Sequence, residues 1–471
     1  MKEGIQRSLG SHFGAATRGS TLFIALVVVF FVVAFVALTV VGIVRYYSPV
    51  PIGDYWEGYL GFYADLREGN YWAWVSQFTE HRPVLPRVLY WLDIQYFGGR
   101  SVFLIFANLL MLSGVVVVLV AYLRRVADRN APRILVAATI CIIAVSWLQR
   151  PNLSSGFYGA QWFMIMLVAL LAFYWLARAR ERPRYFLLAL LAGFASAWTM
   201  ANGILVLPVL VVLAVCIGLQ PMRVAVLAIA AVAAIALYFV GYVQPQIHGE
   251  PWAAVTGDQI GTLQYMLGYL GSPFFHIVSF SLAGLQHVFQ FGGKSTEAFG
   301  LIRDYPMAFA IGLYAAQAAG AVLIALSLVL TWRWFVSGRE ATRGALIAFL
   351  LFIGISAAGT AAGRMVFGTG SSIELRYTTP ALLGWAALIV LGSPSYDLRR
   401  ALSIFVLAVC LLLPSQFFGL RSLAALHEQN LRAMRAVTNG SDDPEIFRQL
   451  GAPVEAKNTV RRLRGSKILD F

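Results

Sequence analysis

The chain has 471 residues, of which 59% are hydrophobic and 14% are aromatic, while only 12% are charged. This composition excludes an ordinary soluble globular protein, because a chain this apolar needs lipid as its main solvent. Apolar runs long enough to cross about 30 Å of hydrocarbon recur along the sequence, and none alternates like a barrel strand. We therefore predict an all-α fold, namely a polytopic transmembrane helical bundle.

About eleven apolar segments are predicted to span the membrane. Their residue ranges are 21–46, 101–123, 133–149, 162–177, 186–200, 203–219, 224–242, 307–331, 344–363, 380–394 and 401–420. The stretch 186–219 is too long for one pass, and Ala201-Asn202-Gly203 favours a break within it. The alternative is one tilted, kinked helix, which would reverse the orientation of every later span.

The basic residues are distributed as expected for a cytoplasmic N-terminus. With that orientation the inner segments hold 17 Lys and Arg but only five Asp and Glu. The inner basic residues are Lys2, Arg7, Arg18, Arg124, Arg125, Arg129, Arg133, Arg178, Arg180, Arg182, Arg184, Arg223, Arg333, Arg339, Arg343, Arg399 and Arg400. Topology therefore explains the formal net charge of +14 better than nucleic-acid binding does. The first span is too long for a signal-peptide core, so we expect an uncleaved anchor.

Three parts of the chain are predicted to lie outside the membrane on the extracytoplasmic side. They are a first outer loop at 47–100, a second outer loop at 243–306 and a small C-terminal segment at 421–471. Residues 1–420, including both loops, are predicted to form one transmembrane module. The first loop spreads eight aromatic residues around acidic ones, which is typical of interfacial helices at the headgroup level. The second loop, around Gly268 to Pro273, is predicted to be re-entrant or interfacial.

The first outer loop also carries charged residues close to both of its membrane boundaries. Asp54 and Glu57 follow the first span, and Glu80-His81-Arg82 with Arg87 precede the second. An aromatic belt does not require these charges, which lie where a lipid headgroup would lie. His81 has no second His or carboxylate at ligand spacing, so we predict no metal site. Secondary candidates for headgroup contact are Arg150, Asn152, Tyr158, Gln161 and Arg364.

Two separated patches carry a resemblance to a known family. The first reads Asp54, Gly69-Asn70-Tyr71-Trp72, His81-Arg82-Pro83-Val84-Leu85, Tyr90-Trp91-Leu92 and Phe97-Gly98. The second, before a late span, reads Arg376-Tyr377-Thr378-Thr379-Pro380. In order and sidedness they resemble the GT-C superfamily of integral membrane glycosyltransferases, in particular the branch of protein O-mannosyltransferases and the lipid A aminoarabinose transferase. The chain departs from that pattern at Glu57, one turn after Asp54 rather than beside it, and at Arg82-Pro83-Val84, where Lys-Pro-Pro is usual.

The resemblance implies an inverting transfer of a sugar from a polyprenyl-phosphate donor to a glycan, lipid or protein acceptor. Such a reaction needs a base for the acceptor hydroxyl and cations for the departing phosphate. The resemblance assigns Asp54 as the base and Arg82 and Arg376 as phosphate ligands, since guanidinium matches phosphate bidentately. The remaining candidates for donor and substrate binding are Glu57, Glu80, His81, Arg87 and Tyr377.

The implied location is the outer face of a bacterial inner membrane, with a cytoplasmic N-terminus and a periplasmic active site and C-terminus. We expect no cofactor, while a divalent cation stays open because scattered acids bind hard cations. Sugar, acceptor and oligomeric state are not specified by these motifs.

Each candidate also has a structural explanation that the sequence leaves open. Asp54 is a favoured residue for capping a helix that starts at Tyr55. Arg82 and Arg87 are suited to anchor the chain at lipid headgroups. Arg376 has Glu374 or Glu80 as a partner for a structural ion pair.

Two other protein classes stay open as well. A secondary transporter or lipid flippase uses many helices with broken segments, and a non-catalytic partner of an envelope polysaccharide assembly system needs no site. Ion-coupled carriers usually bury ionisable residues within their spans, whereas the predicted spans hold only Arg45 near the outer edge of the first and Arg133 at the inner edge of the third. Asp54 discriminates between the classes, because a carrier or scaffold should tolerate Asn at that position.

Overall fold

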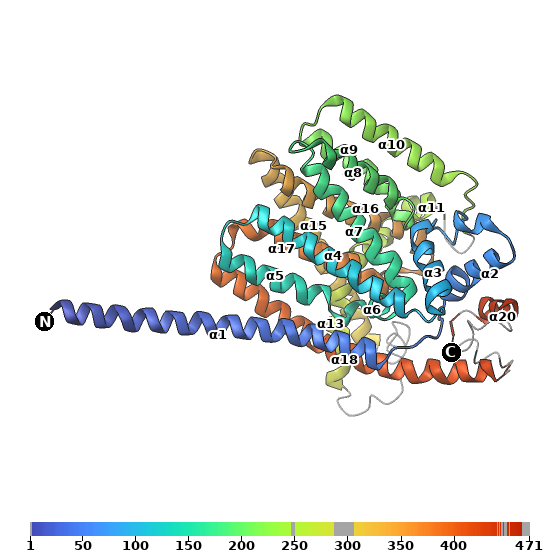
Figure 1. Cartoon of the computed structure of the whole chain (residues 1–471), viewed down its shortest axis with the longest axis horizontal. Helices are drawn as coiled ribbons and strands as arrows, with labels where there is room; N and C mark the ends of the chain where they lie inside the picture. Colours follow the sequence, from blue (N-terminus) through green and yellow to red (C-terminus); the bar gives the residue numbers. More distant parts are fainter. Residues whose placement is uncertain are drawn as a thin grey trace.

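The computed structural model of the chain is a bundle of long helices (Figure 1). It describes residues 2–245, 250–286, 306–439, 441, 443, 446, 450–451 and 453–463. The predicted all-α, polytopic class is confirmed. Parts of the predicted second outer loop, at 246–249 and 287–305, and of the predicted C-terminal segment, at 440, 442, 444–445, 447–449, 452 and 464–471, lie outside the described residues.

The bundle consists of the following α-helices in chain order: α1 (Lys2–Arg45), α2 (Phe62–Arg67), α3 (Val84–Phe97), α4 (Val102–Val126), α5 (Asn130–Ala144), α6 (Arg150–Ser154), α7 (Gly156–Ala177), α8 (Pro183–Ser196), α9 (Val206–Cys216), α10 (Pro221–Phe239), α11 (Pro251–Gly257), α12 (Gln259–Leu270), α13 (Ser272–Gln286), α15 (Pro306–Val336), α16 (Ala341–Arg364), α17 (Thr378–Gly392), α18 (Leu398–Thr438) and α20 (Pro453–Arg462). Short helical turns connect several of them: η1 (Trp56–Gly61), a π-helix, and the 3₁₀ turns η2 (Tyr71–Trp74), η3 (Trp147–Gln149), η4 (Ala201–Leu205), η5 (Met365–Phe367), η6 (Thr369–Ile373), η7 (Leu375–Tyr377) and η8 (Ser393–Ser395).

Nine helical segments of the described residues are long and apolar enough to cross a membrane. Two shorter apolar helical segments, 183–196 and 201–216, correspond to the two halves of the stretch predicted to break. Together these segments correspond one to one with the eleven predicted spans. The last one extends well past its predicted end at residue 420, because α18 continues to Thr438.

A glycine allows the tight turn between α8 and η4. The Ser196 hydroxyl donates to the Gly203 carbonyl at 2.8 Å, which holds the two ends of the turn together. A Cβ at Gly203 would lie 1.8 Å from the Ser196 carbonyl oxygen, so a larger residue does not fit. The backbone therefore turns back at the place where the sequence predicts a break.

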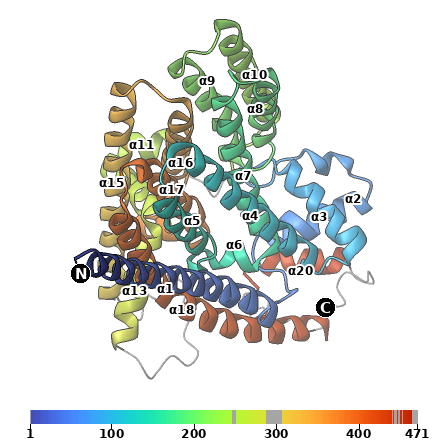
Figure 2. The ribbon, with the colours of Figure 1, turned by 60° about the vertical axis from the view of Figure 1, so that its left-hand side comes forward.

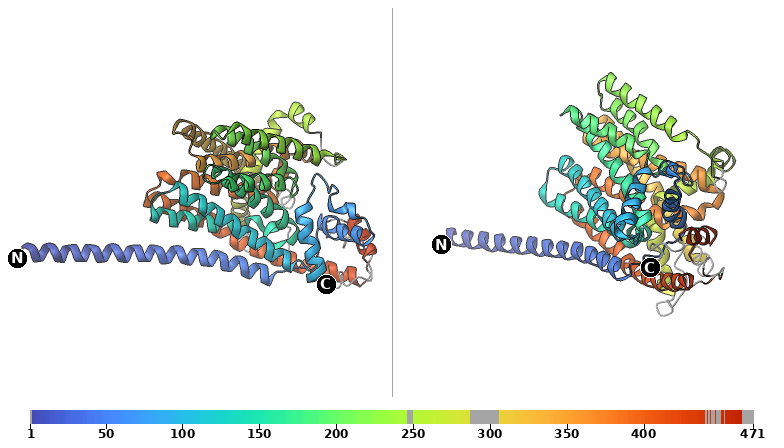
Figure 3. Two further views of the ribbon diagram at one scale, coloured as in Figure 1. Left: turned by 45° about the horizontal axis from the view of Figure 1, so that its top comes forward. Right: turned by 45° about the vertical axis from the view of Figure 1, so that its right-hand side comes forward.

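The loops of the bundle gather at two opposite ends. At the cation-rich end, Arg125 contacts Glu181 at 2.8 Å, and the Arg180 guanidinium donates to the Ile217 carbonyl at 2.6 Å. At the other end, the Leu85 backbone N–H donates to the Trp198 carbonyl at 3.0 Å. The turn after α8 therefore lies beside the first outer loop, which supports two passes over 186–219. Figure 3 shows both ends, with the N-terminus of α1 extending beyond the cation-rich one.

The predicted second outer loop contains helices that pack into the bundle. α12 contacts α15 and α16, while α13 contacts α15 and α18. Figure 2 shows α13 beside α15 and α18. Gly271 joins α12 and α13 at a point of close backbone contact, because a Cβ there would lie 1.8 Å from the Ala316 carbonyl oxygen. These two helices therefore lie beside the turns η6 and η7.

The first outer loop and the C-terminal segment share one apolar core, which also includes residues at the ends of α4 and α7. This core joins residues of η1, α2 and α3 to residues of α18 and α20. α18 carries the chain past the bundle, and α20 lies against the first outer loop (Figure 2). The two predicted extracytoplasmic parts therefore lie together at the end opposite the cation-rich loops.

Candidate active site

Asp54 lies where the chain turns from the end of α1 into the π-helix η1. Its carbonyl oxygen accepts from the Gly58 N–H at 2.8 Å, but η1 has no side-chain cap. The side chain of Asp54 is 47% exposed, so the carboxylate is open to solvent. Gly53 has a φ of +59°, and a Cβ there would lie 3.2 Å from the Tyr158 hydroxyl. The turn thus presents the carboxylate outward and does not use it as a helix cap.

Arg376 reaches Asp54 from η7, at the start of α17. Its Nη1 lies 3.6 Å from Asp54 Oδ2, and its Nε lies 2.6 Å from Glu374 Oε2. The Asn152 amide, on α6, donates to the Arg376 carbonyl at 3.0 Å and to Thr379 Oγ1 at 2.7 Å. The backbone that carries Arg376 is therefore fixed by a neighbouring helix. Two segments from opposite ends of the sequence meet here, as the sequence predicts.

A second ion pair lies nearby and involves Glu80 and His81. The Arg364 Nη2, at the end of α16, is 2.8 Å from Glu80 Oε1. His81 Nε2 lies 3.6 Å from the same oxygen. His81 Nδ1 accepts from the Ala201 N–H at 3.1 Å, so the proton of the neutral ring lies on Nε2.

The charges of both ion pairs affect the pKa of His81. Burial is the main reason that its pKa is lowered; Arg364 and Arg376 lower it further, while Glu80 and Asp54 oppose the shift. His81 is therefore uncharged at neutral pH. We define the charge cluster as Asp54, Glu80, His81, Arg364, Glu374 and Arg376. Its three carboxylates face two guanidinium groups.

Arg82 and Arg87 were both predicted to bind substrate. In the structure, both side chains instead donate hydrogen bonds within the fold. All three nitrogens of the buried Arg82 guanidinium donate to backbone carbonyls, at Tyr238, Val75 and Val240. Arg87 is buried and donates to the Ser76 carbonyl at 2.6 Å. These bonds tie the first outer loop to itself and to the end of α10. Arg82 is set aside as a phosphate ligand because backbone carbonyls already accept from all three of its nitrogens. Arg87 is set aside because it is buried and its Nη1 donates within the first outer loop.

Glu57 and Tyr377, the other two predicted site residues, flank the charge cluster. The pKa of Glu57 is raised, first by partial burial and then by Glu455, Asp54 and Asp65. Tyr377 is buried, with its ring centroid 4.8 Å from that of Tyr269. Glu57 thus faces the C-terminal helix, and Tyr377 packs beneath Arg376.

Arg364 and Glu374 belong to the charge cluster, but the sequence did not predict them as primary site residues. Arg364 is predicted only as a secondary headgroup contact, and Glu374 only as a structural partner of Arg376. The available signals were the place of Arg364 at the outer end of a span and the separation of two residues between Glu374 and Arg376. Neither signal reveals that Arg364 pairs with Glu80, because that contact depends on tertiary packing.

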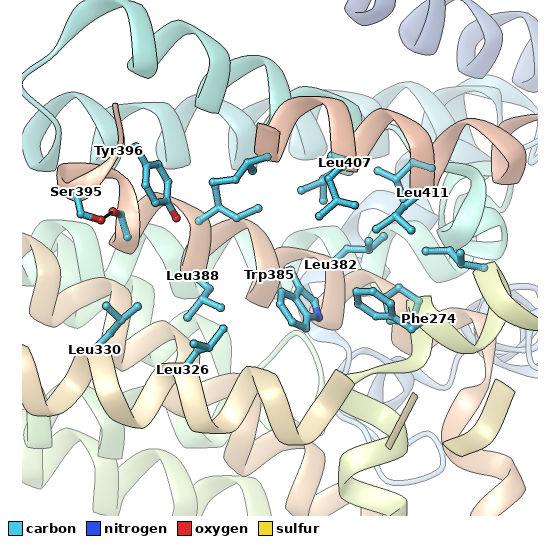
Figure 4. A pocket seen from close by; sticks show the side chains of 18 of the residues that line it. Phe274, Leu326, Leu330, Leu382, Trp385, Leu388, Ser395, Tyr396, Leu407 and Leu411 are labelled. Atoms are coloured by element: carbon cyan, nitrogen blue, oxygen red, sulfur yellow. Dashed lines mark hydrogen bonds between the residues drawn. The ribbon is translucent and has the colours of Figure 1, made fainter. Parts of the chain in front are cut away.

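A separate apolar cavity of about 520 Å³ lies between α13, α15, α17 and α18 (Figure 4). Phe274, Trp385, Leu411 and Tyr396 are among its lining residues. Its described lining includes no member of the charge cluster. The lining is mostly apolar, so it fits hydrocarbon better than a sugar. Within the described part of the chain, no three His, Cys, Asp or Glu side chains are grouped as metal ligands.

The charge cluster combines two chemical capacities at one place. The exposed Asp54 carboxylate is able to accept a proton from a hydroxyl group. The adjacent Arg376, with Arg364 nearby, provides charge-assisted donors for an anionic group. The 3.6 Å separation of Asp54 and Arg376 is longer than a tight hydrogen-bonded ion pair, so both remain able to engage other groups.

Comparison with known proteins gives only distant similarity. No protein-family model matches the chain, and no curated protein matches it. The crystal structure of the apo Archaeoglobus fulgidus oligosaccharyltransferase is 13% identical with a TM-score of 0.44, covering 90% of this chain and 59% of that one. The archaeal oligosaccharyltransferase AglB from Archaeoglobus fulgidus, in complex with an inhibitory peptide and a dolichol-phosphate, is 13% identical with a TM-score of 0.46; the coverage is 91% and 59%. The chain thus spans about three fifths of the length of these structures, and the TM-scores are too low to establish a shared fold.

Proposed function

We propose that this chain is an inverting glycosyltransferase that moves a sugar from a polyprenyl-phosphate donor to an envelope acceptor. The observation that carries the proposal is the 3.6 Å approach of the exposed Asp54 carboxylate to the Arg376 guanidinium. The transfer requires a base and a phosphate-binding cation within one substrate's length of each other. The resemblance of the two sequence patches to GT-C enzymes motivates the choice of reaction.

In the proposed reaction, the acceptor hydroxyl oxygen attacks the anomeric carbon of the donor sugar. Asp54 takes the hydroxyl proton, and the bond between the anomeric carbon and the phosphate oxygen breaks. The bonding electrons leave with the phosphate, whose charge Arg376 and Arg364 stabilise. A phosphate is already a good leaving group, so no general acid is required. A single displacement inverts the configuration at the anomeric carbon.

The remaining cluster residues hold this pair in place. Glu374 orients Arg376, and Glu80 orients Arg364 through the ion pairs at 2.6 and 2.8 Å. The neutral His81 ring fixes the turn between α8 and η4 against the first outer loop by accepting from the Ala201 N–H. The ring of Tyr377 packs against Arg376.

The proposed location is the outer face of a bacterial inner membrane. The charge cluster lies at the end of the bundle opposite the cation-rich loops, and the positive-inside rule assigns those loops to the cytoplasm. Arg364 ends α16, so its guanidinium lies near the membrane boundary, where a polyprenyl phosphate headgroup resides. The proposed donor therefore reaches the cluster from the bilayer, and the acceptor reaches it from the periplasm.

A direct test reconstitutes the purified protein in vesicles and offers a panel of polyprenyl-phosphate sugars labelled in the sugar. Transfer to an acceptor with release of polyprenyl phosphate, and the opposite anomeric configuration in the product, is the expected result. Movement of the intact labelled lipid across the bilayer without cleavage would support the transporter or flippase class instead. Retention of configuration would contradict the single-displacement mechanism.

A further inference from the structure

The C-terminal segment holds the backbone on both sides of Asp54. We define the clamp as residues 450–451 and 453–463, which comprise α20 and the turns at its ends. The Gly53 N–H donates to the Leu450 carbonyl at 2.8 Å, directly before Asp54. The Thr459 hydroxyl donates to the Trp56 carbonyl at 3.3 Å, two residues after Asp54. Asp54 thus lies between two attachments to the same distant segment.

The clamp fits closely against this backbone. Gly451 has a φ of +78°, and a Cβ there would lie 3.3 Å from the Gly53 nitrogen. Leu450 is fully buried, and so is Trp56, in the core that the clamp shares with the first outer loop. Close packing of this kind restricts backbone motion near Asp54.

An ion-pair fork attaches the far end of the clamp. Arg462 Nη2 lies 2.6 Å from Asp65 Oδ1 and 2.7 Å from Glu68 Oε2, and its Nε donates to Glu68 Oε1 at 2.8 Å. Asp65 belongs to α2, which continues directly from the π-helix η1. The fork is bidentate at Glu68, which gives it geometric specificity.

We propose that the clamp is a positioning element that sets the place of Asp54 relative to Arg376. This inference rests on the proposed function for its catalytic consequence. Asp54 stands two residues before a π-helix, an element that is rare and frequently found at functional sites. A displacement of about 1 Å of a reacting group lowers a rate by about 100-fold. The clamp acts through Asp54 and makes no contact with the substrate.

The kinetic test compares full-length Arg462→Gln with Arg461→Gln, a matched change at the neighbouring exposed arginine of the same helix. We expect Arg462→Gln to lower kcat by about tenfold, because part of the positioning is lost. The donor KM should stay within about twofold, since Arg364 and Arg376 are intact. Arg461→Gln should leave both constants unchanged.

Thr459 supplies an independent pair of variants if Arg462→Gln does not fold. Thr459→Val keeps the shape of the side chain and loses the donor to the Trp56 carbonyl, whereas Thr459→Ser keeps the donor. We expect a lowered kcat for Thr459→Val and a kcat close to that of the wild type for Thr459→Ser. Equal effects of the two changes on kcat would overturn the positioning role of this hydrogen bond.

A second arm measures the position of residue 54 without any transfer reaction. Asp54→Cys is placed in a chain whose three native cysteines are replaced by serine, and the alkylation rate of the introduced thiol is measured. The rate should rise several-fold when Arg462→Gln is added and stay unchanged when Arg461→Gln is added. Unchanged alkylation with Arg462→Gln would overturn the clamp, whereas absence of transfer by the wild type would overturn only the proposed function.

Discussion

At the scale of single residues, the arginines of the outer end divide by what their nitrogens contact. Arg82 donates all of its bonds to backbone carbonyls, so it is a structural residue. Arg364 and Arg376 instead contact carboxylates that are themselves partly exposed. A phosphate competes more easily for the second kind of contact, because no buried carbonyl loses its donor.

Arg82→Lys should therefore destabilise the fold and leave donor binding unchanged. A lysine ammonium does not reach three carbonyls in the planar arrangement of a guanidinium, so we expect a loss of about 2 to 4 kcal/mol. Chemical unfolding in detergent measures the stability, and the donor KM measures binding. Arg67→Lys, an exposed change on the same loop, is the control. A raised KM at unchanged stability would assign Arg82 to the phosphate after all.

Glu57→Gln should change stability in a pH-dependent way. The pKa of Glu57 is raised in the folded state, so its stabilising contribution is greatest below the unfolded-state pKa and is lost as pH rises through the folded one. Gln carries no charge, so the variant should have a higher Tm than the wild type at neutral pH. The difference should shrink toward about pH 4. The same change at Glu428, exposed on α18, is the control, and a pH-independent difference would contradict this account.

The sequence predicted part of the candidate site and missed the rest for a physical reason. Asp54 and Arg376 were predicted to meet because both stand next to spans whose outer ends the charge pattern assigns to one side. The pairing of Arg364 with Glu80 depends on how α16 packs against the first outer loop. Two of the three carbonyls that accept from Arg82 belong to the end of α10, and no local pattern reveals that they are free to accept.

At the scale of elements, the breaks in the helices were predictable where a glycine forces them. The Ala201-Asn202-Gly203 break exists because Gly203 allows the backbone to approach Ser196. The π-helix η1 was not predictable, since its sequence has the composition of an ordinary interfacial helix. The helices α12 and α13 were predicted only as a re-entrant or interfacial segment, because their packing on α15 depends on a partner farther along the chain.

Gly271→Ala tests the junction between α12 and α13. Its Cβ would lie 1.8 Å from the Ala316 carbonyl oxygen, so α15 has to move away. We expect a destabilisation of about 1 to 3 kcal/mol, the usual range for overpacking. Thermal unfolding in detergent measures it, with Gly354→Ala as the control because nothing lies within 4 Å of a Cβ there. Equal Tm values for the two variants would contradict close packing at this junction.

At the scale of the whole molecule, the two ends of the helical bundle differ in their chemistry. One end gathers the arginine-rich loops between α4 and α5, α7 and α8, and α9 and α10. The opposite end gathers the first outer loop, the charge cluster and the clamp. The proposed sidedness follows from this separation together with the positive-inside rule.

Single-cysteine labelling in cells tests this sidedness. Tyr71→Cys lies in the exposed turn η2 of the first outer loop, and Arg129→Cys lies in the loop between α4 and α5. In a chain without its native cysteines, an impermeant maleimide should label the first variant in cells with an intact inner membrane. It should label the second only after that membrane is disrupted. Labelling of both from the same side would contradict the eleven-pass topology.

The central claim is that Asp54 takes the acceptor proton beside Arg376. The most direct measurement is the transfer rate of wild type, Asp54→Asn and Asp397→Asn at saturating polyprenyl-phosphate sugar in vesicles. Asp397→Asn is the matched control, since this residue caps the start of α18 at the opposite end of the bundle. We predict a loss of about 100-fold or more for Asp54→Asn, because general-base catalysis contributes at least that much, and wild-type turnover for the control. Equal turnover by wild type and Asp54→Asn would contradict the account.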